Sequence, residues 1–542
     1  MYKLKNRVKF ILILISALIC YSTGFALPKD YNPDSKEKGD ELQRTYNRVF
    51  DLQTNTVSNI QFYTTNYGIF GLNIDRNEGG GVWPRGSLNQ YIFGGGIWFA
   101  AIKNRPDGTP KKYCEISYNP NNGRSWMVPG RIEDGTQLDQ SDIKKYRTFF
   151  STDFRRGDGK PLNPDDGSNW PIWDTNPYPD TLKVDRYFGH YVYDENTRNL
   201  TSYPKGPAFI SGEDIFATFK DTDLNYYDGG YGLRAPEGYP LKLQFEQMIY
   251  SWGFGEYRDF IFIKYDIINK SDDNLLECWM APVMDIDIAR RPLTQAGAAN
   301  DRVRYYDEDP SKNLAIQWTN GDQGEQGNGF GYLGFKFLES PAVDNQGWVR
   351  KDKRSYTVDE QLGLKTFRNW NIADDPNDDD QRYNFLSSRR TDGDDGPGDK
   401  RFMMATGPFN IRPGDTVRVV VGMILAAPAV KSEADGSKED VQGLIAKADF
   451  AQQVYDNNFR APSPPDRSVI LNWEPLNNAI KITWDSTAEI SSDFYERGMD
   501  FMGYRLYRAR RTNLDTFDVD KITQNAQYSL GKGPFGWKQI AS

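Results

Sequence analysis

Short apolar runs separated by turn-forming residues recur along most of the chain, and this pattern constrains the fold more than any other feature. Residues 260–268 are almost continuously apolar, residues 269–274 are polar, and residues 275–283 are apolar again. Runs of this length between turn residues are typical of buried strands. Further strands are predicted at 313–318, 331–338, 402–406 and 416–427. The pattern predicts a mainly β protein, with a large β-sandwich or jelly-roll-like domain over residues 55–460.

The best example of a half-buried strand precedes this region. Leu241, Leu243 and Phe245 alternate with polar residues, which places the three apolar side chains on one face of a strand. Earlier in the chain, the glycine triplet at 94–96 interrupts a strand pattern, and it predicts a bulge or a close approach of another segment.

One segment has the period of an α-helix instead. Ser437 and Asp440 form a capping pair before it. Apolar residues then recur at helical spacing, at Val441, Leu444, Ile445, Ala448, Ala451, Val454 and Tyr455. We therefore expect a helix over 438–457 whose apolar face docks on a sheet. A stiff Pro-rich linker is expected at 461–466.

The first 26 residues have the pattern of a secretory signal peptide. Basic residues precede a short apolar run at 10–19, and small residues stand at Gly24 and Ala26. The run is too short to cross a bilayer, so we expect cleavage after Ala26 and an extracellular or cell-surface protein. Residues 27–54 are expected to form a polar lead-in. No later run is apolar for long enough to predict a transmembrane helix.

Charge and residue usage exclude several functional classes. The net charge of −9 disfavours nucleic acid as a partner, because phosphate binding needs clustered Lys and Arg. His190 is the only histidine, and it lies in an aromatic run typical of a structural strand. Histidine zinc sites and Ser-His-Asp catalysis are therefore disfavoured. Cys114 and Cys278 follow the signal, and both a disulfide and two buried thiols remain open.

Acidic turns are candidate calcium sites, because calcium prefers six to eight oxygen ligands. Asp285 and Asp287 end a predicted strand, and Asp301 could fold back on them, so this group is the best candidate. Asp221 and Asp223 have the alternating spacing of a calcium loop but lack its later glycine and glutamate. A third candidate is the acidic run at 392–399. The alternative is that all three are solvated turns, where Asp is common.

Aromatic residues in loop-rich segments are candidate glycan contacts. Trp83, Trp126, Trp170 and Trp173 could stack on sugar rings, whereas the alternative is packing in the core of a large β domain.

The C-terminal part resembles a fibronectin type III module. The resemblance rests on Ile-Lys-Ile-Thr-Trp-Asp at 480–485 and Gly-Tyr-Arg-Leu-Tyr-Arg at 503–508. It implies that Trp484 packs across a two-sheet sandwich. Residues 467–542 match only the first part of such a module, because the last three strands are missing. We therefore expect further modules of the same protein beyond Ser542.

The preceding region resembles the front of large uncharacterised exported proteins. These carry fibronectin-like repeats and often a C-terminal type IX secretion sorting module. The matching stretches are 66–68, 83–87, 91–94, the Asp285–x–Asp287 stretch and 407–409. The resemblance implies no activity.

The sequence as a whole favours a non-enzymatic role. We expect a secreted or cell-surface protein with a structural, adhesive or ligand-binding function, with glycans or cell-surface molecules as partners. The alternative is a polysaccharide-acting hydrolase that uses two carboxylates, a chemistry that needs no histidine. A Trp-lined groove with two carboxyl groups about 5–10 Å apart would favour this hydrolase.

Overall fold

The structure is a computed structural model of the 542-residue chain. It describes residues 50–73, 76, 78–135, 143–155, 158–164, 170–171, 193–194, 199–200, 209–224, 234–253, 255–292, 297, 299–320, 330–352, 356–429, 434–456, 459, 468, 470–490, 501, 503–504, 506–509 and 537–541. The signal segment, the linker at 461–466, His190 and Trp173 lie outside these residues.

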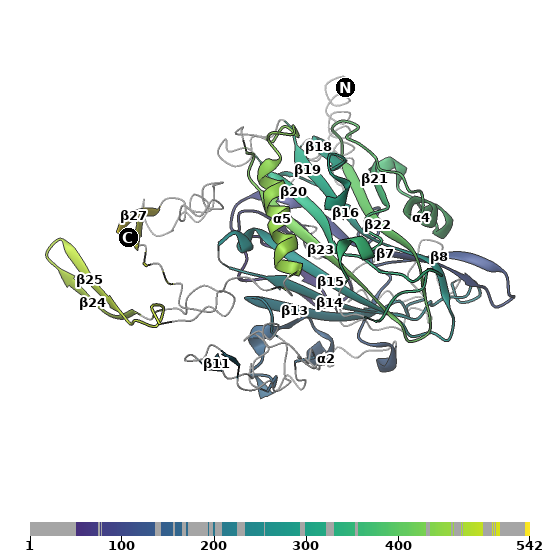
Figure 1. The fold of residues 1–542 in the computed structure, drawn as a ribbon, viewed down its shortest axis with the longest axis horizontal. Helices are drawn as coiled ribbons and strands as arrows, with labels where there is room; N and C mark the ends of the chain where they lie inside the picture. Colours follow the sequence, from purple (N-terminus) through teal and green to yellow (C-terminus); the bar gives the residue numbers. More distant parts are fainter. Residues whose placement is uncertain are drawn as a thin grey trace, which may run out of the picture.

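Two antiparallel sheets form the body of the protein (Figure 1). The large sheet has the order β10 (Phe149–Phe150), β13 (Glu213–Lys220), β14 (Leu243–Ser251), β15 (Phe260–Asn269), β23 (Thr416–Ala426), β20 (Tyr332–Glu339), β19 (Leu314–Thr319) and β18 (Asp301–Tyr305), and β9 (Val128–Pro129) also pairs with β13. The smaller sheet has the order β21 (Thr366–Asn371), β22 (Lys400–Ile411), β16 (Leu275–Asp285), β7 (Gly94–Asn104) and β8 (Pro110–Ile116).

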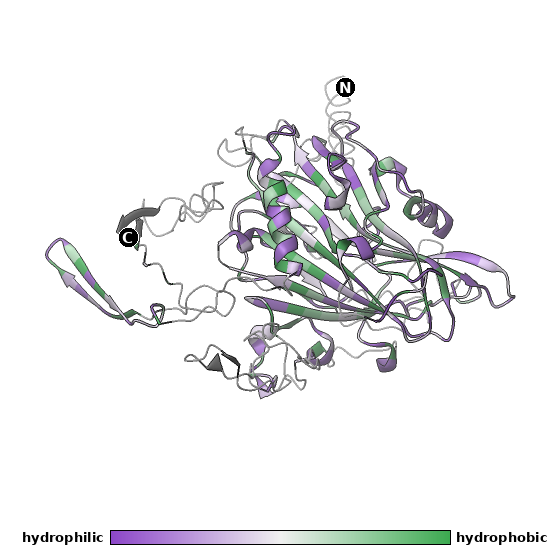
Figure 2. Ribbon diagram, in the orientation of Figure 1, coloured by the Kyte–Doolittle hydropathy of each residue, from purple (hydrophilic) through white to green (hydrophobic). Residues whose placement is uncertain are grey.

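The two sheets pack face to face around one apolar core. Phe99 of β7 contacts Phe245 of β14 across the interface, with ring centroids 6.4 Å apart, and Phe335 of β20 contacts Phe402 of β22 at 5.6 Å. All four rings are essentially excluded from solvent. Burial of each such side chain contributes roughly 1.5–3 kcal/mol to folding. Figure 2 shows hydrophobic residues along the strands of both sheets.

A helix covers the outer face of each sheet. α5 (Gln442–Asp456) packs on β23 and β20 of the large sheet, and Lys447 in α5 forms an ion pair with the fully buried Asp259 at 2.7 Å. α4 (Asp379–Leu386) packs on β7, β8, β16 and β22 of the smaller sheet. The result is a four-layer arrangement of helix, sheet, sheet and helix.

Two of the places where the chain crosses between the sheets are neighbouring corners. A polar turn joins β15 to β16, and a second turn joins β22 to β23. The two turns hold each other, because the Asn269 N–H donates to the Asp415 carbonyl at 3.0 Å and the Gly414 N–H donates to the Asn269 carbonyl at 2.7 Å. Each corner places sequence neighbours in opposite layers.

One loop covers an edge of both sheets at once. We call residues 388–399 the edge loop. Its Asp392 N–H donates to the Phe367 carbonyl of the edge strand β21 at 3.0 Å, and its Gly398 N–H donates to the Asp301 carbonyl of the edge strand β18 at 3.0 Å. Unpaired strand edges invite association with other chains, so this loop protects the body of the protein.

Short strand pairs complete the description. Near the start of the chain lie β1 (Leu52–Thr54) with β2 (Tyr63–Thr65), β3 (Leu72–Asn73) with β4 (Glu78–Gly79), and β5 (Gly81–Val82) with β6 (Asn89–Ile92) and β17 (Ala289–Arg290). The remaining pairs are β11 (Tyr193–Asp194) with β12 (Asn199–Leu200), β24 (Ile470–Leu476) with β25 (Ala479–Trp484), and β26 (Leu506–Ala509) with β27 (Trp537–Ala541). The remaining helical turns are α2 (Ile143–Tyr146) and the 3-10 turns at Ile132–Asp134, Ser151–Asp153, Gly255–Asp259, Pro310–Lys312, Val358–Glu360 and Ile372–Asp374.

The mainly β class and the sandwich of large antiparallel sheets are confirmed. The apolar run at 260–268 became the interior strand β15, which pairs with β14 and β23. The glycine triplet in β7 permits close packing, because a Cβ on Gly95 would lie 2.6 Å from the Phe70 ring. The described part of the chain contains no helix long and apolar enough to cross a membrane.

Several details differ from the sequence prediction. β14 is buried on both faces rather than one, because flanking segments cover its outer side. α5 begins at Gln442 rather than 438, since the Asp440 carboxylate accepts a hydrogen bond from Tyr332 at 2.6 Å and residues 438–441 form a turn. The polar segment of α4 was not predicted as a helix. Residues 52–54 belong to the folded body, because β1 pairs with β2.

The two cysteines lie on opposite faces of the smaller sheet. Cys114 of β8 packs in the outer cluster under α4, whereas Cys278 of β16 packs in the core between the sheets. Both thiols are free and buried. Their separation by the sheet excludes a disulfide between them in this fold.

Candidate functional site

The sequence-predicted acidic group comes together at one end of the sandwich. Asp285 is the last residue of β16, Asp287 follows two residues later, and Asp301 begins β18 in the other sheet. The Asp301 Oδ1 atom accepts a hydrogen bond from the Ile288 N–H at 3.1 Å, so this carboxylate folds back beside the strand end. We call Asp285, Asp287 and Asp301 the acidic group; all three side chains are buried.

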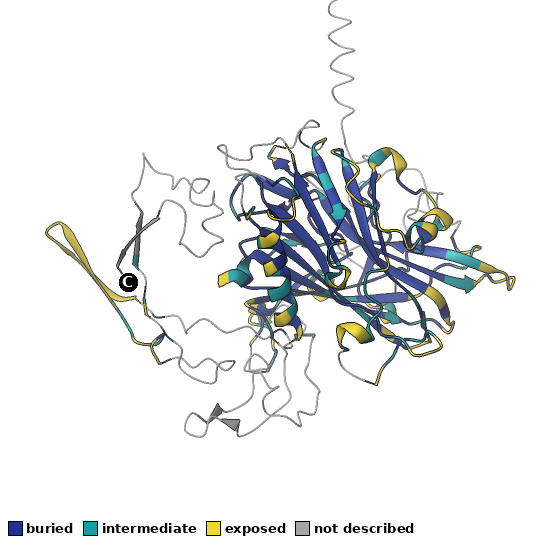
Figure 3. Ribbon diagram, turned by 45° about the horizontal axis from the view of Figure 1, so that its top comes forward, coloured by how far each residue is buried: buried dark blue, intermediate teal, exposed yellow. Residues whose placement is uncertain are grey.

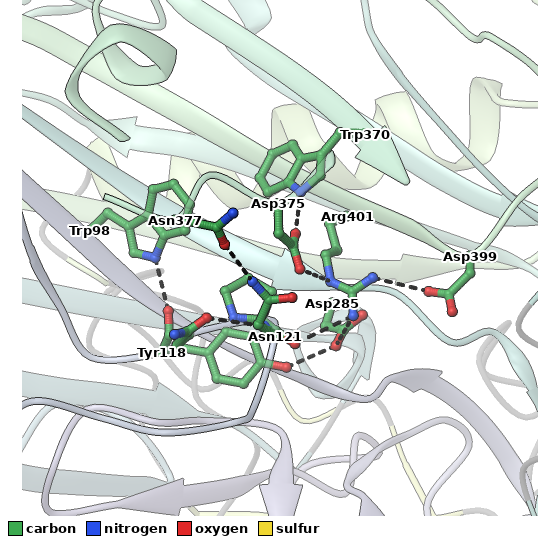
Figure 4. A network of polar contacts seen from close by, with 11 residues as sticks. Trp98, Tyr118, Asn121, Asp285, Trp370, Asp375, Asn377, Asp399 and Arg401 are labelled. Carbon is green, nitrogen blue, oxygen red and sulfur yellow. Dashed lines mark hydrogen bonds and ion pairs between the residues drawn. The ribbon is translucent and has the colours of Figure 1, made fainter. Parts of the chain in front are cut away.

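Arg401 on β22 is the cation that pairs with Asp285. Strand register places it directly opposite Asp285, and its Nη2 atom lies 3.3 Å from Asp285 Oδ2. Its guanidinium also lies 3.2 Å from Asp399 and 3.6 Å from Asp375, so three carboxylates share one charge (Figure 4). The Tyr118 hydroxyl donates to Asp285 Oδ2 at 2.9 Å.

Burial raises the pKa of every carboxyl in the acidic group. Burial raises the pKa of Asp285, although Arg401 opposes the shift. Burial and the neighbouring Asp285 raise the pKa of Asp287 well above its usual value. Burial, followed by Asp287, raises the pKa of Asp301 in the same way. The Asp301 Oδ2 atom has no hydrogen-bond partner among the described residues.

The edge loop lies directly over this group. The Ile286 N–H donates to the Lys400 carbonyl at 3.0 Å, so β16 continues to pair with the chain that leaves the loop. Arg302 of β18 forms an ion pair with Asp394 of the loop at 2.8 Å, and Lys400 forms one with Asp395 at 2.6 Å. The predicted acidic run and the acidic group are therefore two parts of one site.

The ligands that calcium would use here are limited. Asp285 is engaged by Arg401 and Tyr118. Across the described ranges, no group of three or more Asp, Glu, His or Cys side chains is arranged to hold a metal ion. Calcium at this site would therefore use Asp287 and Asp301 with carbonyl oxygens.

Asp221 and Asp223 lie elsewhere and do not join the acidic group. Both are fully buried, and Asp221 Oδ1 accepts the Leu243 N–H at 2.8 Å. Burial raises the pKa of Asp221 to about 6. Its neighbours include Glu115, which forms a fully buried ion pair with Arg234 at 2.5 Å. Asp221 thus has a structural role in capping a strand. The later part of that predicted calcium loop, from residue 225 on, lies outside the described residues.

The tryptophans expected as glycan contacts are buried. Trp83, Trp126 and Trp170 are each at most 3% exposed. Trp126 packs against the Arg234 guanidinium, 4.7 Å from its ring centroid, and Trp170 stacks on Phe209 at 5.3 Å. These three side chains therefore pack in the core, and they do not line the groove that a polysaccharide-acting hydrolase would need.

The sequence offered no signal for the partners of the acidic group. Arg401, Tyr118 and Asp375 lie far from Asp285 along the chain and follow no motif. Only the pairing of β16 with β22 and the packing of neighbouring loops bring them together.

Comparisons with known proteins give no function. No protein family matches the chain, and no curated protein matches it. Among solved structures, the chain is similar to a putative aldose 1-epimerase from Escherichia coli K12, at 7% identity over 70% of this chain and 99% of that chain, with a TM-score of 0.21. That score carries no argument about activity.

Proposed function

We propose that this chain is an exported surface protein with a structural or adhesive role, and that it engages its partner through the β24–β25 hairpin. The observation that carries the proposal is an exposed apolar face on this hairpin. Trp473 and Ile480 are each 66% exposed and Ile482 is 37% exposed. Figure 3 shows the hairpin as an exposed arm.

Strand register divides this hairpin into two unlike faces. Trp473 lies opposite Ile482 and Pro475 lies opposite Ile480, so these four apolar side chains share one face. We call them the hairpin face. Glu474 lies opposite Lys481 on the other side, and Asn472 lies opposite Thr483. A sheet with one apolar and one polar face needs a cover on the apolar side.

Physical reasons favour a partner that supplies strands. An isolated two-stranded hairpin is marginally stable in water, and its edges carry unpaired N–H and C=O groups. A partner that adds strands would satisfy the edges and bury the hairpin face. In contrast, the edge loop protects two sheet edges in the body of the protein.

The fibronectin type III resemblance supports the same proposal. The Tyr504 ring packs against Trp484 with centroids 5.1 Å apart, and the Tyr504 hydroxyl lies 3.0 Å from Ser468 Oγ. These contacts tie the segment before β26 to the end of β25 and to the residues just before β24. Export through the N-terminal signal and retention at the cell surface are parts of the proposal.

Calcium is a further part of the proposal, with Asp287 and Asp301 as its carboxylate ligands. The hydrolase alternative has less support, because Trp83, Trp126 and Trp170 are buried and the edge loop contacts the strand that carries Asp301.

The test is surface retention of the full chain in the producing cells. Trp473→Ser combined with Ile480→Ser should release most of the protein into the medium. The double variant has lost the two apolar side chains that would be buried against the partner. Lys481→Ser, on the polar face of the same hairpin, is the matched control and should leave retention unchanged. Equal retention of all three proteins would contradict a docking role for the hairpin face.

A further inference from the structure

A pocket opens beside the edge loop, separate from the hairpin face. Its volume is about 460 Å³, which falls within the range of about 300–1,000 Å³ typical of small-molecule sites. Strand β21 and the edge loop line it through Arg368, Asn369, Arg390, Thr391, Asp392, Gly393, Asp394 and Asp395. We call this space the loop pocket. Its wall consists of guanidinium, carboxylate, amide, hydroxyl and backbone groups.

The centre of this wall is held rigidly. Asp392 accepts hydrogen bonds from Arg368 Nε at 2.8 Å, from Arg390 Nη2 at 3.1 Å and from the Asn369 N–H at 3.2 Å. The Asn369 side chain donates to the Gly393 carbonyl at 2.8 Å and to a carbonyl of β18. The loop pocket is therefore built before any ligand arrives, which lowers the entropic cost of binding.

Its charges are nearly balanced. The cations are Arg368 and Arg390 in the wall, with Arg302 and Lys400 behind it. They are paired with the three carboxylates of Asp392, Asp394 and Asp395, so these groups together carry one excess positive charge. A strongly charged ligand of either sign would meet repulsion from one set of these groups.

Donors and acceptors both remain available in the wall. Arg368 uses its Nε atom for Asp392, and its guanidinium lies over the Phe385 ring at 4.5 Å. Arg390 is 65% exposed and Asp395 is 51% exposed. A sugar hydroxyl donates to a carboxylate and accepts from a guanidinium at the same time, so vicinal hydroxyls match this alternation of groups.

We propose that the loop pocket binds a neutral saccharide through hydrogen bonds from its hydroxyl groups to Arg368, Arg390 and Asp395. The ion pairs Arg368–Asp392 and Arg302–Asp394 also fasten the edge loop to β21 and β18. The contacts that shape the loop pocket are therefore also the contacts that hold the loop over the two sheet edges. This inference is independent of the hairpin face, and each can fail without the other.

The test is calorimetric titration of the full chain with glucose, galactose, mannose, maltose and cellobiose, each up to about 10 mM, which detects millimolar affinities. At least one sugar should bind. Arg390→Gln should weaken that binding by at least about tenfold, equivalent to about 1.4 kcal/mol. The thermal stability of the Arg390→Gln variant should differ little from that of the wild type, because the Arg390 side chain is largely exposed. Pull-down with insoluble polysaccharide distinguishes a polymer ligand from a free sugar.

Arg155→Gln is the matched control, because Arg155 forms a similarly exposed ion pair with Asp158 in another part of the chain. It should leave sugar binding unchanged. The proposal is overturned if no neutral sugar or polysaccharide binds, if Arg390→Gln binds as tightly as the wild type, or if only glucuronate or inorganic phosphate binds.

Discussion

Arg401 and Asp285 lie directly opposite each other on β22 and β16, 3.3 Å apart and almost fully buried. This pair connects the middle of the smaller sheet to the acidic group and to the edge loop. The arginine also faces Asp375 and Asp399, so it is the cation on which several buried carboxylates depend.

Loss of Arg401 should strongly destabilise the protein. Arg401→Met leaves Asp285 and Asp375 buried without their cation, and we expect a loss of about 3–5 kcal/mol in the free energy of unfolding. Chemical denaturation at neutral pH measures it. The loss should shrink in acid, where these carboxyl groups are protonated. Arg350→Met removes an exposed pair with Asp352, and solvent screening should make its cost much smaller. Similar losses for both variants would contradict the central role of Arg401.

Neutralising Asp301 should stabilise the protein in EDTA. Burial raises the folded-state pKa of Asp301 above the unfolded value of about 3.9. The carboxyl group therefore makes its full contribution to the free energy of unfolding below about pH 4, and this contribution is lost as the pH rises through the folded-state pKa. Asp301→Asn keeps the acceptor for the Ile288 N–H and removes the charge. At pH 8 we expect a gain of about 1 kcal/mol or more. Unfolding curves from pH 4 to 8 measure it, and a variant less stable than the wild type at pH 8 in EDTA would refute this account.

Calcium should raise the melting temperature if Asp287 and Asp301 bind it. A ligand at one hundred times its Kd stabilises a fold by about 2.7 kcal/mol. Differential scanning calorimetry in calcium and in EDTA measures the difference. Asp301→Asn should abolish the calcium effect, whereas Asp221→Asn should preserve it, because Asp221 caps a strand elsewhere. An identical melting temperature of the wild type in calcium and EDTA would rule out this ion.

The cysteines should react only after unfolding. Cys114 and Cys278 are buried on opposite faces of one sheet, and burial raises the pKa of both thiols well above the usual value. A thiol reagent should label neither in the native protein and both in denaturant. Dithiothreitol should leave the melting temperature unchanged. A drop in melting temperature on reduction would indicate a disulfide and a different arrangement of the sheet.

The sequence by itself determined the β class, most of the long strands and the docked face of α5. These features depend on local alternation, because a buried strand or helix face must repeat apolar residues with the period of its backbone. The position of Asp285 and Asp287 at a strand end also followed from local pattern. The polar helix α4 did not, because its short sequence carries little apolar periodicity.

Only the tertiary structure decided which distant residues meet. The register of β16 with β22 places Arg401 beside Asp285, and the alternation of side chains across the smaller sheet separates Cys114 from Cys278. The burial of Trp126 against Arg234 likewise depends on a loop that returns from far along the chain. A shift of one residue in strand pairing moves every side chain to the other face, and no local pattern encodes that choice across a hundred residues.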